Sequence, residues 1–205
     1  MIPVALQPEP ANFNAKVRLP GRQFLRRTPH PTRKQWSKNN YWNKSIQDLG
    51  AAYGDICAYC AEWIPPITGA CSVDHFVPKS SRPPLAYEWS NFRFAASRYN
   101  NLKGDFTDVL DPFSLSADWF ILDFTSLQEK PNDILGAAEK LSVQKTLDRL
   151  QLNDQRAIDS RERWIDAYAN GEITFDFLRR TAPFIAYELE RQGLRQAIIQ
   201  IVKSP

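Results

Sequence analysis

The sequence predicts an α+β fold in which a small strand–loop–strand–helix core lies between a basic N-terminal arm and a mainly helical C-terminal part. Two short β-branched or aromatic runs, 70–75 and 91–95, flank a loop that contains Pro83 and Pro84, and a helix-like segment follows from Ser97. Further along the chain, apolar residues recur at helical spacing. We therefore expect an arm over 1–50, a core over 51–112, and a mainly helical part over 113–205 that packs on the core.

Size and composition are those of a globular protein. The chain has 205 residues, of which 43% are hydrophobic and 12% aromatic. No stretch is long and apolar enough to span a bilayer, and the first residues lack the charged start and apolar run of a signal peptide. Three cysteines, an odd number, favour a reducing compartment over a disulfide scaffold. We expect a cytoplasmic protein with no membrane partner.

The N-terminal arm carries an uncompensated positive charge. Between residues 10 and 47 there are nine Lys or Arg residues and no Asp or Glu, whereas the rest of the chain has 17 basic and 23 acidic residues. Such an arm attracts a polyanion through counterion release. We expect nucleic-acid contacts at four of its residues, namely Arg26, Arg27, Arg33 and Lys34.

Two features of this arm bear on its conformation. Aromatic residues lie between the charges, which suits stacking on bases; it suits equally well an arm whose aromatic rings dock on the core while the cations stay solvated. Six prolines within 1–47 argue against long helices before Thr32, so we expect an extended arm.

The remaining elements are predicted from periodicity and from helix-breaking residues. Ser97 is expected to be the N-cap of the core helix, which places Asn100 in its first turn. The other expected elements are a short helix over 41–53, a strand over 119–124, a polar turn over 131–133, helices through 141–152 and 158–168, a short helix at 175–178, and a helix from Pro183 to Ile201.

The core contains a set of polar residues that suits metal-dependent hydrolysis. Asp74 and His75 end the first strand-like run, Asn91 begins the second, and Asn100 lies on the helix. A carboxylate and an amide oxygen are ligands for one hard divalent ion, and an imidazole with a pKa near 6.5 suits a general base at neutral pH. Adjacent strand residues point to opposite faces, so the strand must twist or end at this pair for both to serve one site.

The order and spacing of these residues resemble the HNH nuclease motif on a ββα-metal scaffold, in its His-Asn-Asn form. Asn91 lies sixteen positions after His75, and Asn100 lies nine positions after Asn91. The resemblance implies that Asp74 and Asn100 bind the metal, that His75 is the general base, and that Asn91 fixes the loop that positions His75. The Pro-Lys-Ser after the histidine and the Asn-x-x-Lys-Gly on the helix are also features of the family.

Lysines in these last two motifs are candidate phosphate contacts. They are Lys79 and Lys103, and the alternative for each is an ordinary solvated lysine.

A Cys-x-x-Cys pair before the motif raises the question of zinc. Many HNH proteins have a second such pair that completes a four-cysteine site, but the equivalent positions here are Ala96 and Tyr99. Cys71 adds a third thiol near Cys57 and Cys60 in the sequence. Because structural zinc sites need four protein ligands, we do not expect structural zinc, and we expect these thiols to fill the hairpin core.

The resemblance implies a metal-dependent endonuclease that uses Mg²⁺ or Mn²⁺ to hydrolyse phosphodiester bonds, with DNA as the first expectation. Segments 87–91 and 146–153 also look like bacterial HNH proteins of this size, some of which work beside an ATPase in Septu-type and retron-linked anti-phage systems. No Walker-type glycine loop occurs in the sequence, so an ATPase would be a separate subunit. Two alternatives stay open: a non-catalytic nucleic-acid-binding module, and a nuclease that cuts tRNA or other RNA.

Overall fold

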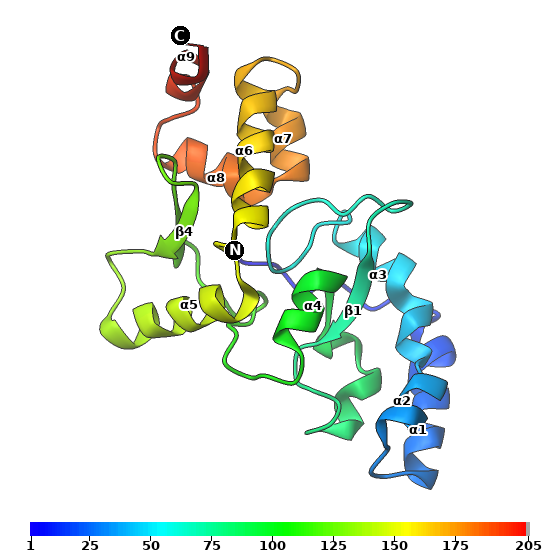
Figure 1. The fold of residues 1–205 in the computed structure, drawn as a ribbon. Helices are drawn as coiled ribbons and strands as arrows, with labels where there is room; N and C mark the ends of the chain where they lie inside the picture. The colour runs from blue at the N-terminus through cyan, green and yellow to red at the C-terminus, as the bar shows by residue number, and fades with distance from the viewer. Residues whose placement is uncertain (204–205) are drawn as a thin grey trace. The chain divides into compact units, whose positions relative to one another are not determined.

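The computed structural model describes residues 1–203, and side chains up to residue 200; Ser204 and Pro205, and the side chain of Ile201, lie outside the described part. It confirms an α+β fold, with helices and two small antiparallel sheets of two strands each (Figure 1). No helix in the described part is long and apolar enough to cross a membrane.

The chain forms two compact units that do not follow the expected boundaries. Unit 1 comprises 1–4, 58–63 and the chain from Asp108 onward, and unit 2 comprises 5–57 and 64–107. Each unit is therefore built from segments that are separated in the sequence, and the arm expected over 1–50 belongs mostly to unit 2.

The N-terminal segment of unit 2 is helical, and the expectation of an extended arm is wrong for most of it. Helices η1 (Asn14–Arg18) and α1 (Leu19–Arg27) are continuous, and α2 (Arg33–Lys38) follows after a short gap. Pro20 is tolerated because it lies in the first turn of α1, where a missing N–H costs little. Thr32 starts α2 with a capping box that includes Gln35.

Aromatic side chains of this segment dock on the core of unit 2. Phe13 is buried and contacts Trp89 and Phe92 edge to face, with ring centroids 5.5 and 5.7 Å away. The backbone of Gly21 in α1 lies against the ring of Tyr87. A Cβ at this position would be only 2.1 Å from that ring, so the close approach requires glycine. Phe13 therefore docks on the core, which is one of the two roles expected for the aromatic residues of the arm.

A hairpin and a helix form the centre of unit 2. Strand β1 (Cys71–His75) pairs antiparallel with β2 (Phe92–Ala96), with His75 opposite Phe92 and Cys71 opposite Ala96. Between the strands lie η3 (Pro83–Tyr87) and η4 (Trp89–Asn91), and α4 (Ser97–Lys103) follows β2 directly. Helices η2 (Tyr41–Ser45) and α3 (Ile46–Ala52) correspond to the short helix expected over 41–53.

Ser97 is the first residue of α4 and not its N-cap, so that prediction is wrong. The cap position is Ala96, and no side chain caps the helix. The Ser97 N–H instead donates to the Ala70 carbonyl oxygen at 2.7 Å. Because β2 runs straight into α4, the neighbouring backbone satisfies a donor that a capping side chain would otherwise satisfy.

Unit 1 contains one hairpin and five helices among its described residues. The hairpin pairs β3 (Phe120–Asp123) with β4 (Gln128–Pro131), and β4 occupies a segment where the sequence predicted no strand. The helices are α5 (Ala137–Leu150), α6 (Gln155–Ala169), α7 (Phe175–Thr181), α8 (Pro183–Arg191) and α9 (Ala197–Lys203). The helix expected from Pro183 to Ile201 is interrupted at Gly193, whose φ of 68° lies in the left-handed region.

A buried arginine connects β4 to α6 in unit 1. Arg161 donates to Glu129 Oε1 at 2.8 Å, to the Leu127 carbonyl oxygen at 2.6 Å and to the carbonyl oxygen of Leu152. Both Arg161 and Glu129 are buried. Oε2 of Glu129 also pairs with the N-terminal ammonium group of Met1 at 2.7 Å, so the buried carboxylate is held by two cations. Removal of either cation weakens the compensation of a charge that water does not reach.

We expect Arg161→Met to destabilise unit 1 by about 3–5 kcal/mol, because it removes one of the two cations that pair with the buried Glu129 carboxylate, the other being the N-terminal ammonium group of Met1, and leaves the carbonyl oxygens of Leu127 and Leu152 without their donor. The matched control is Arg179→Met, which removes an exposed pair with Glu190 and should cost less than about 1 kcal/mol. Urea unfolding followed by circular dichroism measures both. Equal losses for the two variants would contradict the assignment of Arg161 to the core of unit 1.

Candidate active site

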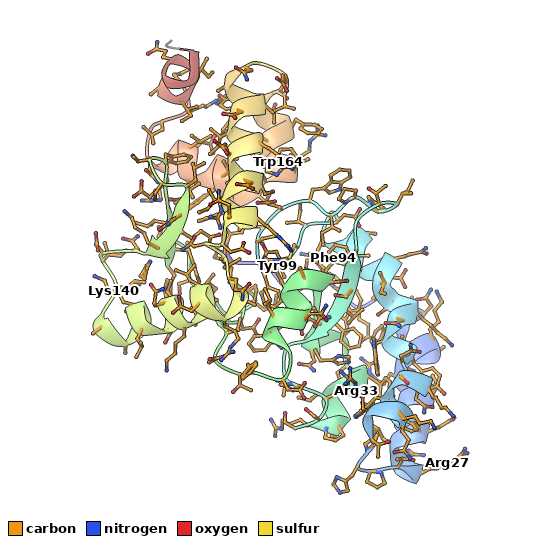
Figure 2. The ribbon with its side chains drawn as sticks, in the orientation of Figure 1. Arg27, Arg33, Phe94, Tyr99, Lys140 and Trp164 are labelled. Atoms are coloured by element: carbon orange, nitrogen blue, oxygen red, sulfur yellow. The ribbon has the colours of Figure 1, made fainter. Side chains whose placement is uncertain are left out.

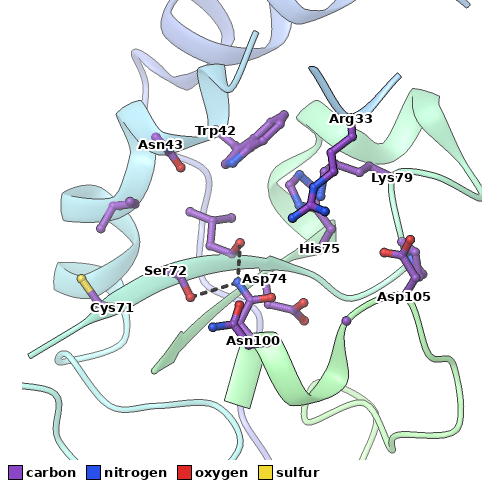
Figure 3. Close-up of a pocket in the computed structure, with 15 residues that line it drawn as sticks. Arg33, Trp42, Asn43, Cys71, Ser72, Asp74, His75, Lys79, Asn100 and Asp105 are labelled. Carbon is purple, nitrogen blue, oxygen red and sulfur yellow. Dashed lines mark hydrogen bonds between the residues drawn. The ribbon is translucent and has the colours of Figure 1, made fainter. Parts of the chain in front are cut away.

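Three of the four predicted catalytic residues face one cavity in unit 2, and the fourth, Asn91, does not line it. The cavity has a volume of about 570 Å³. Asp74, His75 and Asn100 are among its lining residues, together with Trp42 and the cations Arg33 and Lys79 (Figure 3). Residues contributed by α2, η2, β1, α4 and the loop after β1 therefore meet at one place, as the spacing of the motif predicted for 74, 75 and 100.

The His75 ring is held by two aromatic edges and one hydrogen bond. The ring centroid lies 4.8 Å from that of Trp42 and 5.3 Å from that of Phe92, both nearly perpendicular. Nε2 lies 3.0 Å from the carbonyl oxygen of Ala86. Because a carbonyl oxygen can only accept, we assign the hydrogen to Nε2, which leaves the lone pair of the neutral ring on Nδ1.

Nδ1 of His75 is the ring atom available for chemistry. It has no hydrogen-bond partner among the described residues, and none of their buried side-chain N or O atoms lacks a partner. Nδ1 must therefore be accessible from the cavity, although the residue as a whole is only 6% exposed. Burial, together with the positive charges of Lys79 and Lys103, lowers the pKa of His75 to about 3, so the ring is neutral at physiological pH.

Asn91 holds the loop that follows His75. Its Oδ1 accepts from the Val77 N–H at 2.8 Å, while Nδ2 donates to the carbonyl oxygens of Val77 at 3.0 Å and Leu85 at 3.2 Å. One buried amide thus joins the chain just after β1 to η3, next to the Ala86 carbonyl that binds His75. The position agrees with the loop-fixing role that the resemblance implies.

Asn100 presents an oxygen to the cavity. Its Nδ2 donates to Ser72 Oγ at 3.0 Å and to the Val73 carbonyl oxygen at 3.3 Å (Figure 3). The carbonyl of Val73 fixes the orientation of the amide, because only the NH₂ group can face an acceptor. Oδ1 has no hydrogen-bond partner among the described residues and is available as a ligand.

Asp74 is almost completely buried and is paired inside the protein. The residue is 2% exposed, and its Oδ1 lies 3.2 Å from Nζ of Lys103. Lys103 is 0% exposed, so the prediction that it binds a phosphate is wrong. Since α4 ends at Lys103 and packs on β1, this lysine points inward and serves Asp74 instead of solvent.

The carboxylate of Asp74 and Oδ1 of Asn100 fit a hard divalent cation such as Mg²⁺, because both are oxygen ligands facing one cavity. Within the described part of the chain, no group of three or more His, Cys, Asp or Glu residues could hold a metal ion. Cys57 is buried, and its Sγ accepts a hydrogen bond from the Ala96 N–H at 3.4 Å. Cys57 belongs to unit 2 and Cys60 to unit 1, whereas Cys71 lines the cavity.

Two of the six predicted nucleic-acid contacts line the cavity, and four, including the buried Lys103, do not. Arg33 and Lys79 line it, and neither forms an ion pair with another described residue. Nζ of Lys79 lies 5.5 Å from the Trp42 ring centroid, and burial lowers the pKa of its ammonium group. Arg26, Arg27 and Lys34 are exposed but do not line the cavity; Figure 2 shows Arg27 at the end of the N-terminal helices.

Sequence reasoning missed three groups that shape the site. Trp42 supports the His75 ring, the Ala86 backbone orients it, and Ser72 helps to orient Asn100. The aromatic residues of the arm were noted, but their spacing does not single out Trp42. A backbone carbonyl carries no signal in the sequence at all.

A scan against models of known protein families found no match for this chain, and no curated protein matched it.

The depressed pKa of His75 predicts how stability depends on pH. Below about pH 6.5 the unfolded chain binds a proton at this position, whereas the folded protein does not bind one until about pH 3. The free energy of unfolding therefore decreases as the pH is lowered through this range. Between about pH 7 and about pH 5, wild type should lose roughly 2 kcal/mol more than His75→Gln, whose amide can still donate to Ala86.

Urea unfolding at several pH values measures this difference. His30, the other histidine, is exposed and present in both proteins, so it cancels in the comparison. Parallel pH profiles for wild type and His75→Gln would show that His75 titrates normally in the folded protein.

Proposed function

We propose that this chain is a metal-dependent HNH-type endonuclease that hydrolyses phosphodiester bonds, with DNA as the proposed substrate. The observation that carries the proposal is the environment of His75. A neutral imidazole with an accessible Nδ1 faces the same cavity as a carboxylate, an amide oxygen and two cations without ion pairs. This set of groups matches the needs of a reaction in which water attacks a bound phosphate.

The residues divide the reaction between them. Nδ1 of His75 takes a proton from the attacking water, while the Nε2–H bond to Ala86 keeps the ring in the tautomer that has its lone pair on Nδ1. Arg33 and Lys79 bind the phosphate as cations at the wall of the cavity. Asp74 and Asn100 hold the metal ion, which when bound supplies charge compensation for the leaving oxygen.

The bound substrate also favours the charged form of the base. The anionic phosphate adds negative charge beside His75, and this raises the tendency of the ring to accept a proton when water attacks. In the free protein, burial and two nearby lysines oppose protonation. His75 is thus neutral before substrate binds, which is the state that a general base requires.

The biological setting proposed here rests on the resemblance of 87–91 and 146–153 to HNH subunits of bacterial anti-phage systems. In that setting a separate ATPase is the proposed partner. The cleavage assays below are therefore to be run on the chain alone and again with any ATPase encoded beside it.

Cleavage of plasmid DNA and of tRNA with Mg²⁺ or Mn²⁺, with EDTA as the control, tests the activity. His75→Ala should lower the rate by about 10²- to 10⁴-fold, the range typical of a general base, and should keep DNA binding. Asp74→Ala should lose activity in a way that added metal partly restores, because Asn100 remains as a ligand. Arg179→Met, in unit 1, is the control with unchanged cleavage.

Four results would contradict or redirect this proposal. Cleavage by His75→Ala as fast as by wild type would remove the general base. Metal-independent cleavage by wild type would remove the role of Asp74 and Asn100. Binding without cleavage on every substrate and with both metals would favour the non-catalytic module, and cleavage of RNA alone would redirect the proposal to an RNA nuclease.

The two cavity cations should govern substrate binding. We expect Arg33→Met and Lys79→Met each to weaken DNA binding and to reduce the slope of log K against log salt by about one unit. Lys34→Met is the matched control, because Lys34 neighbours Arg33 on α2 but lies outside the cavity lining. Fluorescence anisotropy with labelled DNA over a range of salt concentrations measures the slope; a slope that falls as much for Lys34→Met as for Arg33→Met would contradict the assignment.

A further inference from the structure

Trp42 contacts two of the groups that line the cavity. Its indole ring is nearly perpendicular to the imidazole of His75, with ring centroids 4.8 Å apart and an interplanar angle of 88°. Nζ of Lys79 lies 5.5 Å from the centroid of the same indole ring. All three residues line the cavity, and Trp42 is only 9% exposed (Figure 3). One aromatic side chain thus connects the proposed general base with a proposed phosphate contact.

The indole ring limits rotation of the His75 imidazole. The hydrogen bond from Nε2 to the Ala86 carbonyl oxygen holds one atom of that ring. A flip of the ring about its χ2 bond would break this bond and exchange the positions of Nδ1 and a ring carbon. Trp42 at 4.8 Å and Phe92 at 5.3 Å, both nearly perpendicular to the imidazole, oppose the flip by close packing. Of these two neighbours, Trp42 is the one that lines the cavity.

Lys79 depends on the same ring for its position. An ammonium group over an indole ring is attracted by the negative face of the ring, more strongly when the cation is partly removed from water. Lys79 is half-buried and forms no ion pair with another described residue. The carboxylate of Asp105 also lines the cavity, and its charge acts on Lys79. Without the indole ring, Lys79 would be free to turn toward Asp105 and away from a bound phosphate.

Packing on its other neighbours holds Trp42 in place. Its ring centroid lies 6.0 Å from that of Trp36 on α2 and 5.8 Å from that of Tyr87 on η3, and both of these residues are buried. The carbonyl oxygen of Trp42 accepts a hydrogen bond from Ser45 Oγ at 2.7 Å. A side chain locked by packing in this way can hold the groups of a site in a fixed geometry.

We propose that Trp42 is a positioning residue with two tasks: its ring holds the His75 imidazole in one orientation and keeps the Lys79 ammonium group at the cavity wall. The base and the phosphate-binding cation then keep one position relative to each other. This inference rests on the proposed function, because it takes His75 as the base and Lys79 as a phosphate contact.

The orientation of His75 can be measured without any activity. The chain has only two histidines, so ¹⁵N-edited NMR spectra of the metal-free protein at neutral pH resolve both rings. Wild type should show a single neutral tautomer of His75 with the hydrogen on Nε2. Trp42→Leu, which has no aromatic ring, should show a mixture of both neutral tautomers, whereas Trp42→Phe should keep the tautomer of wild type. His30 should be unchanged in every variant.

A packing control separates this role from a loss of stability. Leu49→Ala creates a cavity in α3, outside the lining of the active-site cavity; it should lower the melting temperature and leave the His75 signals unchanged. If Trp42→Leu does not fold, Trp42→Met takes its place. If neither folds while Leu49→Ala does, Trp42 is a residue of the core and the positioning role is overturned.

A double-mutant cycle tests the contact with Lys79, with fluorescence anisotropy of labelled DNA as the readout. Lys79→Met should weaken DNA binding about threefold or more in wild type but less than about twofold in Trp42→Leu, because the cation is already misplaced there. Arg33→Met is the matched control, because Arg33 forms no cation–π contact with Trp42 in the described part; its effect should be equal in both backgrounds. With saturating DNA, Trp42→Leu should cut roughly tenfold more slowly than wild type, and Trp42→Phe should recover most of the rate.

The outcomes distinguish the inference from the proposed function. Unchanged His75 tautomers in Trp42→Leu, a mixture of tautomers in wild type, or an additive cycle with Lys79 would each overturn the shared positioning role, even if wild type cleaves DNA. Conversely, wild type that binds but never cleaves nucleic acid would overturn the proposed nuclease, while a changed tautomer and a non-additive cycle would still support the two contacts of Trp42.

Discussion

The antiparallel pairing of β1 with β2 is the constraint on which the rest of unit 2 depends. The register places His75 opposite Phe92 and Cys71 opposite Ala96, so β2 ends where β1 begins and α4 starts immediately. This start brings Asn100 back beside Ser72 and Val73, and it brings Lys103 to the far end of β1. A shift of one residue in the register would reverse the side-chain directions along the strand and disperse the site.

The site has one buried ion pair and, separately, two cations that line the cavity. The buried carboxylate of Asp74 is balanced internally by Lys103, and His75 adds no charge because its ring is neutral. The cations that line the cavity, Arg33 and Lys79, form no ion pair with a described residue, but Asp105 also lines the cavity and its charge acts on Lys79. Since Asp74 is paired with Lys103, the two cations outnumber the remaining carboxylate of Asp105, and this favours an anion such as a phosphate.

The sequence was sufficient to predict the hairpin, the helix after it and the meeting of 74, 75 and 100 at one cavity, because strand alternation and helix periodicity are local. Features that depend on neighbours in space could not be predicted from the sequence. Pro20 predicts a helix break unless its position in a first turn is known, and β4 has charged residues and a proline that do not suggest a strand. The direction of Lys103 depends on how closely α4 approaches β1, which no single-residue property encodes.

The contact between Gly21 and Tyr87 has a consequence for how the His75 ring is held in place. The ring of Tyr87 fills the space that a side chain at residue 21 would occupy, so α1 packs directly against η3 and limits its movement. Ala86, the neighbour of Tyr87, carries the carbonyl that orients His75. α1 is thus connected to the His75 ring through Tyr87 and the Ala86 carbonyl, and a displacement of this helix would move the group that orients the proposed general base.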